Sequence, residues 1–170
     1  GVIRGTAINH GGRVSGFTVP SPNSQSMAIR EALSKAQVEP SEITYIEGHG
    51  TGTDLGDPIE VTGLTRALVD TKSPVQECFL GSVKSNIGHL EASAGIAAIH
   101  KVLLQMKHKT IVPSLHSTSL NPNIEFSKLP FKVPQKQTNW ELLQNQTRRI
   151  AGVNSFGAGG ANAHVVMEEY

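Results

Sequence analysis

The chain is organised around the segment GSVKSNIGHLEA, residues 81–92, and the apolar stretch that follows it. Residues 78–83 have the apolar character of a short strand, a polar turn follows, and a helix is expected from residue 90 to about 107. The first half of this helix is apolar almost all round, which predicts a central, buried helix. Lys84 and His89 then lie between the strand and that helix, with His89 at its N-terminal end. The helix dipole opposes protonation of an imidazole there, so the turn is either a site for chemistry or an ordinary solvated turn.

The composition restricts the class of protein. A chain of 170 residues is expected to form one domain with a real core. Its formal net charge is +1, it has no basic run and few aromatic residues, so we expect neither a nucleic-acid partner nor a membrane partner. The single cysteine, Cys78, lies in an apolar run and is predicted to be an inert buried thiol. The seven histidines show no zinc-type spacing and the glycine-rich stretches match no nucleotide-binding pattern, so neither a metal nor a nucleotide is expected.

The two ends of the chain carry further expectations. No signal peptide and no long apolar span is visible, which predicts a cytoplasmic protein. The sequence begins without Met, directly on strand-like residues, so we expect it to be part of a longer protein.

Strand-like and helix-like segments alternate along the chain. Strands are expected at 1–8, 43–46, 78–83, 149–153 and 163–167, helices from Asn23 or Ser24 to about Ala36, from Asp57 to 68 and from 90 to 107, and loops at 9–13 and 16–23. Asp57 is predicted to be the N-cap of its helix, with Glu60 completing a capping box. This alternation predicts an α/β domain whose mainly parallel sheet is covered on both faces. Residues 111–140 contain four prolines and little periodicity, and a long surface excursion is expected there.

Three segments carry candidate site residues. His49 lies between glycines at the end of a predicted strand, with Thr51 and Thr53 close behind, and strand ends are where ligands bind in open α/β sheets. The alternative is a solvated histidine in a glycine-rich connection. The second segment is the turn that holds the lysine and histidine described above. The third is Gly157 to Gly160, whose backbone N–H groups could point at an oxyanion or could simply form a tight turn between two strands.

These segments resemble a known family. EGHGTGTDLGDPIEV (47–61), GSVKSNIGHLEASAGIAAI (81–99) and NSFGAGGANAHVVMEE (154–169) are similar to the three C-terminal signature blocks of β-ketoacyl synthase domains, above all those of modular polyketide synthases. The similarity runs in order from end to end of the chain. Ala158 stands where many members carry a second Phe, and in this the chain resembles bacterial synthases that use separate acyltransferases.

The resemblance implies a thiolase-like fold in which two similar α/β halves form five layers. The present chain, residues 1–170, would be the C-terminal half, with the helix from 90 to 107 at its centre. The family uses a Cys-His-His site, and the match places its two histidines at His49 and His89 and its lysine at Lys84.

The same resemblance implies the substrate contacts. Thr51 and Thr53 match residues that hold the phosphopantetheine arm of an acyl carrier protein. Phe156 matches a position whose backbone N–H contributes to an oxyanion hole and whose ring gates the cysteine. No cofactor is expected on this chain itself, because the substrates travel on the carrier's arm.

The nucleophilic cysteine of the family belongs to the N-terminal half, which also carries most of the dimer contact, and this sequence lacks its motif. Cys78 is no substitute. The expected parent is a homodimeric ketosynthase that condenses an acyl thioester with a malonyl carrier protein, and this chain alone is expected to be inactive. The alternative is a non-catalytic acyl-carrier docking or assembly module with a vestigial site. The presence of His49 argues against it, because condensation-incompetent relatives often lose that histidine.

The expected mechanism requires a particular placement of the two imidazoles. As carbon dioxide leaves the malonyl group, negative charge develops on the thioester oxygen, and two neutral imidazoles can stabilise it by donating N–H groups. We therefore expect the rings of His49 and His89 to lie on the same side of the sheet, close enough to share one oxygen.

Overall fold

The computed structural model describes residues 1–12, 16, 19–144 and 146–170 of the chain. Among these residues, six strands form one mixed sheet in the order β1-β8-β7-β2-β3-β5. Their bounds are β1 Val2–His10, β2 Tyr45–Glu47, β3 Cys78–Gly81, β5 Phe131–Lys132, β7 Ile150–Phe156 and β8 Ala161–Glu168. The pairs β7–β2, β2–β3 and β3–β5 are parallel, whereas β8 and β1 join antiparallel at one edge. The predicted α/β class with a mainly parallel sheet is confirmed.

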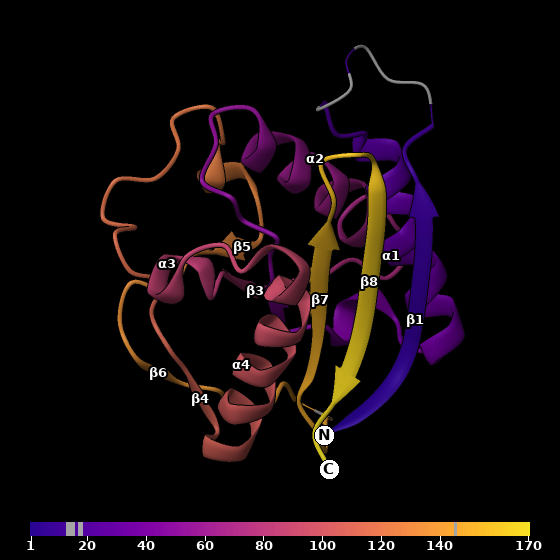
Figure 1. Cartoon of the computed structure of the whole chain (residues 1–170). Coiled ribbons are helices and arrows are strands. Elements are labelled where there is room, and N and C mark those ends of the chain that lie inside the picture. The colour runs from indigo at the N-terminus through magenta and orange to yellow at the C-terminus, as the bar shows by residue number, and fades with distance from the viewer. Residues whose placement is uncertain (13–15, 17–18, 145) are drawn as a thin grey trace.

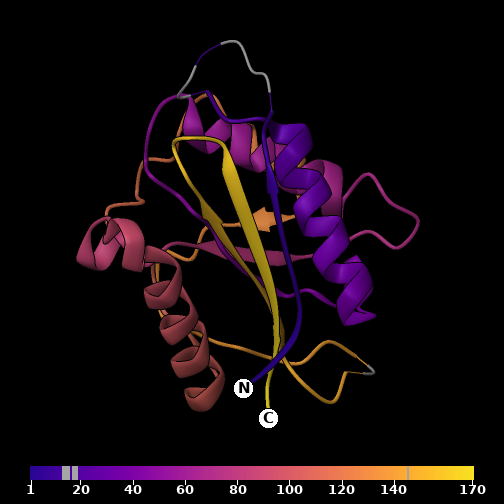
Figure 2. The ribbon, with the colours of Figure 1, turned by 45° about the vertical axis from the view of Figure 1, so that its right-hand side comes forward.

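Helices cover the two faces of the sheet unequally. Helices α1 (Pro22–Ala36) and α2 (Gly56–Leu68) pack on one face, and α4 (Ala94–His108) packs on the other, as Figures 1 and 2 show. The part of the second face formed by β1 and β8 has no helix over it among the described residues, and Ile3 and Ile8 are exposed there. The expectation of a sheet covered on both faces is therefore only partly met. None of the helices in the described part of the chain combines the length and apolar character needed to cross a bilayer.

The helix starts differ from the expected ones. α1 begins at Pro22, and its N-cap is Ser21, whose Oγ accepts the N–H of Ser24 at 3.3 Å. α2 begins at Gly56, whose N–H is donated to Thr53 Oγ1 at 3.0 Å. Asp57 is thus inside the helix, and the predicted capping box is wrong, because the side chain of Glu60 binds elsewhere.

The β1 strand is longer than expected and takes in Asn9 and His10, the first residues of the predicted loop at 9–13. Arg13, which that loop was to include, lies outside the described residues, as do parts of the predicted irregular segment 16–23. The two C-terminal strands are also longer than predicted and form an antiparallel hairpin. The predicted strands at 149–153 and 163–167 lie within this hairpin, except that Arg149 precedes β7.

The segment that follows β3 departs most from the prediction. The expected polar turn contains a short helix, α3 (Lys84–Ile87), and the expected helix at 90–107 is divided into η2 (Glu91–Ser93) and α4. Gly88 and Glu91 both have positive φ angles, which a continuous helix does not allow. His89 therefore lies between α3 and η2, and the prediction that the N-terminus of the central helix acts on it is wrong.

The helix α4 is amphipathic in this chain, although its sequence predicted burial all round. Ala98, Val102 and Met106 are buried against the sheet, whereas Ile96 is 53% exposed and Leu104 is 55% exposed. Apolar residues on the outward face of a helix normally face a partner or a site of association.

We expect the isolated chain to self-associate or to be only marginally stable, because this outward face of α4 exposes apolar surface to water. Light scattering coupled to gel filtration over a range of protein concentrations measures the effect. A matched variant, Ile96→Glu with Leu104→Glu, should remain monomeric at concentrations at which the unmodified chain associates. A stable monomer at every concentration, with no response to these substitutions, would contradict the prediction.

Residues 111–140 form less of a surface excursion than predicted. β4 (Thr110–Ile111) pairs with β6 (Thr138–Asn139), η3 (Phe126–Lys128) lies between them, and β5 extends the main sheet next to β3. Phe131 and Trp140 are buried in the two cores. A strand of two residues is too short to show an alternation of apolar and polar residues, so the sequence did not predict β5.

Candidate active site

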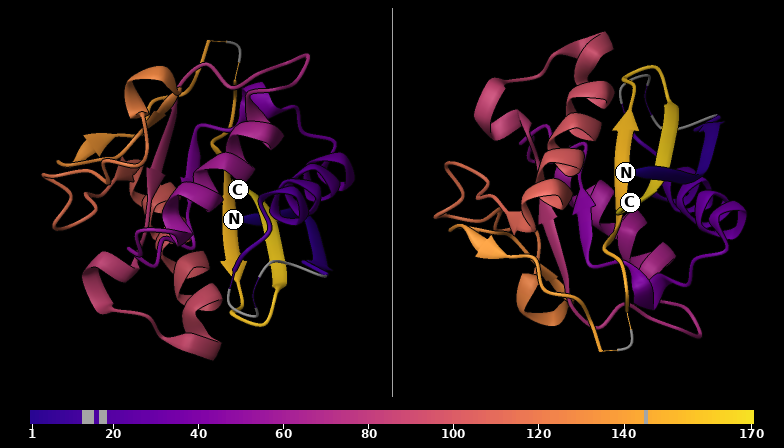
Figure 3. Two further views of the ribbon diagram at one scale, coloured as in Figure 1. Left: turned by 90° about the horizontal axis from the view of Figure 1, so that it is seen from above. Right: turned by 90° about the horizontal axis from the view of Figure 1, so that it is seen from below.

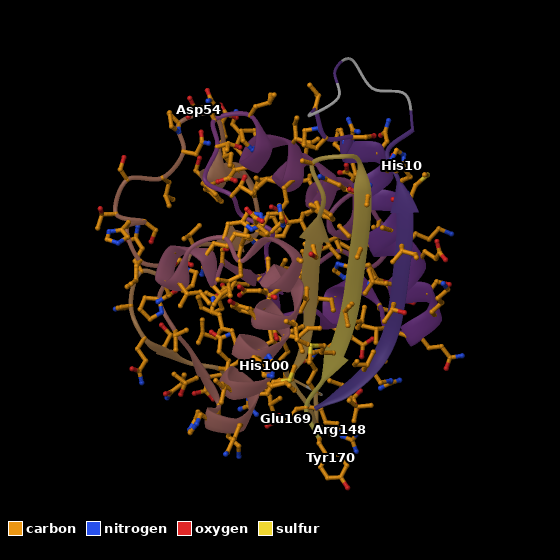
Figure 4. The ribbon with its side chains drawn as sticks, viewed as in Figure 1. His10, Asp54, His100, Arg148, Glu169 and Tyr170 are labelled. Carbon is orange, nitrogen blue, oxygen red and sulfur yellow. The ribbon has the colours of Figure 1, made fainter. Side chains whose placement is uncertain are left out.

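The candidate residues gather at one end of the sheet. His49 follows the end of β2, Lys84 follows the end of β3, and Phe156 is the last residue of β7. Because β2 is paired in parallel with both neighbours, these three strand ends lie side by side, where ligands bind in open α/β sheets. The chain termini lie close together (Figure 3), and Figure 1 shows them at the opposite end of the sheet. Tyr170 marks that end in Figure 4.

The two histidines meet at this end. The ring centroids of His49 and His89 are 5.2 Å apart, with an angle of 81° between the ring planes. The ring of Phe156 lies on another side of His49, with a centroid distance of 5.8 Å. His49 is half-buried and His89 is exposed in this chain. The expected proximity of the two imidazoles is confirmed, whereas their catalytic roles stay predictions.

Backbone N–H groups fix the proton positions on both rings. Phe156 donates its N–H to Nδ1 of His49 at 3.3 Å, and Glu91 donates its N–H to Nδ1 of His89 at 2.9 Å. A ring nitrogen that accepts a hydrogen bond carries no proton, so each neutral imidazole holds its proton on Nε2. The pair therefore presents two Nε2–H donors from one end of the sheet.

The same hydrogen bond bears on the expected role of Phe156. In this structure its backbone N–H is donated to His49 and its ring packs against the site, whereas its part in an oxyanion hole stays a prediction. The N–H of Gly157 is likewise donated to Ala161 O at 2.7 Å, and that of Gly160 to Gly157 O at 3.0 Å. The glycine segment is thus a closed turn between β7 and β8. Among the residues that the structure describes, the N–H groups of Ala158 and Gly159 have no acceptor.

The surroundings of His49 keep it neutral. Burial lowers its pKa to about 4, and the positive charge of Lys84 and the neighbouring His89 act in the same direction. Lys84 is itself half-buried, and burial lowers the pKa of its ammonium, while the carboxylates of Glu60 and Glu47 oppose this. The neutral state predicted for His49 thus comes from burial and from Lys84, and not from a helix N-terminus.

Replacing Lys84 with methionine should raise the pKa of His49 towards its ordinary value. The positive charge of Lys84 disfavours a second cation, so its removal makes the imidazolium less costly, while burial keeps the rise partial. An NMR titration of ¹³C-labelled histidine in the protein measures the shift. Lys107→Met, at an exposed position on α4, is the control and should leave the His49 titration unchanged. An unchanged or lower pKa in Lys84→Met would contradict the expectation.

A buried carboxylate that the sequence did not reveal holds the His49 loop. Glu60 accepts the N–H of His49 at 2.7 Å, the N–H of Gly50 at 2.8 Å and the Nδ2–H of Asn154 at 2.8 Å. Asn154 in turn accepts Nδ1–H of the buried His164 at 2.7 Å. Every carboxylate oxygen of Glu60 is therefore paired, as a buried charge requires. A signal was present, because Glu60 lies four residues before Leu64 and so on the apolar stripe of α2.

Two cavities adjoin the site, one on either side of the loop after β2. The first, of about 400 Å³, is lined by both histidines, Thr51, Thr53, Gln25, Phe156, Gly157, Ala158 and Gly160. Lys84 lies along the second, of about 550 Å³, together with Ser82, Ser85 and Ser114. Thr51 and Thr53 are exposed, with 3.3 Å between their Oγ1 atoms. The structure thus brings five of the six predicted site residues to one cavity, while Lys84 lines the other cavity and acts on the pKa of His49 through its charge.

The remaining expectations concern cysteine and metals. Cys78 is fully buried in the core, and burial raises the pKa of its thiol, so it is not a thiolate nucleophile. Among the described residues, no group of three or more His, Cys, Asp or Glu side chains could hold a metal ion.

The sequence matches two described families over almost its whole length. Residues 1–118 match "Beta-ketoacyl synthase, C-terminal domain", and residues 121–170 match "Ketoacyl-synthetase C-terminal extension". Polyketide synthase PksL of Bacillus subtilis is 54% identical over 177 residues, and polyketide synthase ThaG of Burkholderia thailandensis is 54% identical over 171 residues. Both similarities cover 100% of this chain, but only 4% and 3% of those proteins.

Solved structures agree with these sequence matches. The ketosynthase domain OzmH KS7 of Streptomyces albus has a TM-score of 0.95 at 46% identity, and the ketosynthase from module 6 of the bacillaene synthase of Bacillus subtilis has 0.93 at 45%. Each similarity covers 99% of this chain and 30% of the solved chain. The chain therefore belongs to the β-ketoacyl synthase C-terminal domain family and is the C-terminal half of a ketosynthase domain of the polyketide synthase type.

Proposed function

We propose that this chain supplies the two histidine donors of a ketosynthase that extends a polyketide by decarboxylative Claisen condensation. The observation that carries the proposal is the pair of imidazoles, 5.2 Å apart, whose Nδ1 atoms both accept backbone N–H groups. Two preorganised Nε2–H donors in a cavity suit an oxygen on which negative charge develops. Neither ring has to accept a proton in this role.

The proposed reaction proceeds in two steps. In the first, an acyl group is transferred to the cysteine of the N-terminal half, and the carrier thiol leaves. In the second, the bond between the malonyl α-carbon and its carboxylate breaks and carbon dioxide leaves. The electron pair of the broken bond stays with the α-carbon and forms the enolate of the carrier thioester. The enolate carbon then attacks the acyl thioester, a carbon–carbon bond forms, and the cysteine thiolate is released. His49 and His89 stabilise the enolate oxygen.

The other residues have supporting roles in this proposal. Thr51 and Thr53 line the same cavity as the histidines and would hold the phosphopantetheine arm of an acyl carrier protein, which brings both substrates. Burial keeps His49 neutral, and the positive charge of Lys84 adds to this effect. For the oxyanion of the acylation step, the candidate donors on this chain are the N–H group of Phe156, which is donated to His49 in this structure, and the N–H groups of Ala158 and Gly159. The parent is proposed to be a homodimer, and its cytoplasmic location stays a prediction.

A non-catalytic docking or assembly module is the alternative. A vestigial site has no need of preorganised donors, yet here Glu60 and two backbone N–H groups orient His49 and His89. The geometry therefore favours condensation.

The test uses the complete ketosynthase, that is, this chain together with its N-terminal half. The protein is mixed with acyl carrier and malonyl carrier proteins, and mass spectrometry follows the acyl-enzyme and the β-ketoacyl product. Condensation by the complete protein, and none by the isolated chain, is the expected result. Acyl loading or carrier binding without any product would favour the docking module instead.

A further inference from the structure

A second buried carboxylate lies beneath the site: Glu47 opens the first of the three sequence blocks, but neither the sequence analysis nor the proposed mechanism gives it a role. Glu47, the last residue of β2, is fully buried. Its Oε2 accepts Tyr45 Oη–H at 2.6 Å and pairs with Lys101 Nζ at 2.8 Å, and Lys101 is itself buried on α4. A buried ion pair often adds no net stability compared with apolar residues of the same volume. Its presence here therefore calls for another reason.

The other oxygen of this carboxylate holds the segment that carries the site. Oε1 of Glu47 accepts the backbone N–H of Val83, which is the N-cap residue of α3. Lys84 is the first residue of α3, and His89 follows its last turn by two residues. One hydrogen bond therefore ties the start of this segment to the end of β2, from which His49 also projects.

The backbone beside the cluster is shaped to accommodate it. A Cβ atom at Gly81 would lie 2.4 Å from Tyr45 Oη and 3.2 Å from Lys101 Nζ. Glycine at the end of β3 thus lets Tyr45, Glu47 and Lys101 pack directly against the strand that leads into Val83. The cluster and the turn after β3 form a single packed unit.

We infer that Glu47 is a positioning residue of the active site: its carboxylate, neutralised by Lys101 and oriented by Tyr45, fixes the turn from which Lys84 and His89 project towards His49. This inference rests on the proposed function. Glu47 and Glu60 then have matching tasks. Glu60 holds the backbone of the His49 loop, and Glu47 holds the backbone of the opposing segment, so that the relative placement of the two imidazoles depends on both.

Two double variants of the complete ketosynthase test the inference. Glu47→Gln with Lys101→Met removes both charges but keeps an oxygen that can accept the Val83 N–H. Glu47→Leu with Lys101→Met removes the charges and the acceptor, and an apolar pair of this kind is compatible with folding. We expect the first variant to condense within about fivefold of the unmodified protein, and the second to lose about a hundredfold, as misplacement of catalytic groups by about 1 Å can do. Acyl loading should stay within about tenfold in both, which shows that the fold and the cysteine are intact.

Two outcomes would overturn the inference. If both double variants condense as well as the unmodified protein, the hydrogen bond to Val83 is not needed. If both lose condensation to the same extent, the charge and not the acceptor matters. If the leucine variant does not fold, the single variant Glu47→Asp tests the positioning role of Glu47 instead. It keeps the charge beside Lys101 but shortens the reach to Val83, and should lose at least about tenfold in condensation; activity at the unmodified level would refute the role. An unmodified protein that loads acyl groups but never condenses would instead refute the proposed function.

Discussion

Replacing His49 with alanine in the complete ketosynthase is expected to lower condensation by at least about a hundredfold, while acyl loading stays within about tenfold. Acylation needs a thiolate and an oxyanion hole, whereas the enolate needs both imidazole donors, and the alanine removes one of them. The substitution also leaves the Phe156 N–H without its acceptor. Intact-protein mass spectrometry measures loading and product release measures condensation on the same sample.

The control for this experiment is His108→Ala, at an exposed position in the last turn of α4, which should affect neither step. A His49→Ala protein that cannot be loaded, yet condenses normally once it is loaded chemically, would assign His49 to acylation. The assignment of two enolate donors would then be wrong.

Replacing Trp140 with alanine is expected to destabilise the protein by about 3–5 kcal/mol, the usual cost of removing a buried large aromatic side chain. Trp140 is 2% exposed and packs in the core under α4, with its ring centroid 5.4 Å from that of Tyr45. Its Nε1–H is donated to Thr44 Oγ1 at 2.9 Å. The residue thus anchors the long segment between α4 and β7 to the strand that leads to His49.

Thermal unfolding of the complete ketosynthase, in parallel for the unmodified protein and the variant, measures this loss. Trp140→Phe is the matched variant, because it keeps an aromatic ring and removes the donor, and it should cost clearly less. A melting temperature unchanged by Trp140→Ala would show that the segment at 111–140 contributes little to the core, as its sequence alone predicted.

The local elements of this protein follow from its sequence to a large extent. The apolar stripes of α1 and α2 repeat with the helical period, and the short runs at 43–46 and 78–83 consist of residues typical of strands, so both kinds of element can be recognised from the sequence. Element boundaries were less accurate. The caps at Ser21 and Thr53 depend on which side chain reaches a free N–H, and several candidates stand side by side in each stretch.

The burial of α4 and the breaks before it could not be predicted in this way. Because the first half of α4 is apolar almost all round, its sequence does not show which side faces outward. Only the packing of Ala98 and Val102 against the sheet shows which side is left exposed. The break at Gly88 and Glu91 depends on two positive φ angles that the hydrophobic pattern does not report. His89 therefore does not lie at the N-terminus of the central helix, where the sequence placed it.

The sequence alone was enough to name candidate residues for the site, because the glycine-flanked His49 and the Lys84–His89 turn follow recognisable strands, and the structure brings the two histidines together. Only the tertiary structure decided what surrounds them. Glu47 and Glu60 reach backbone N–H groups 36 and 11 residues away in the chain, and neither contact leaves a local pattern. The same holds for the hydrogen bond that Phe156 N–H donates to His49, since parallel pairing of β7 with β2 brings together residues 107 positions apart. Proximity of this kind is a property of the sheet order, which no stretch of sequence contains.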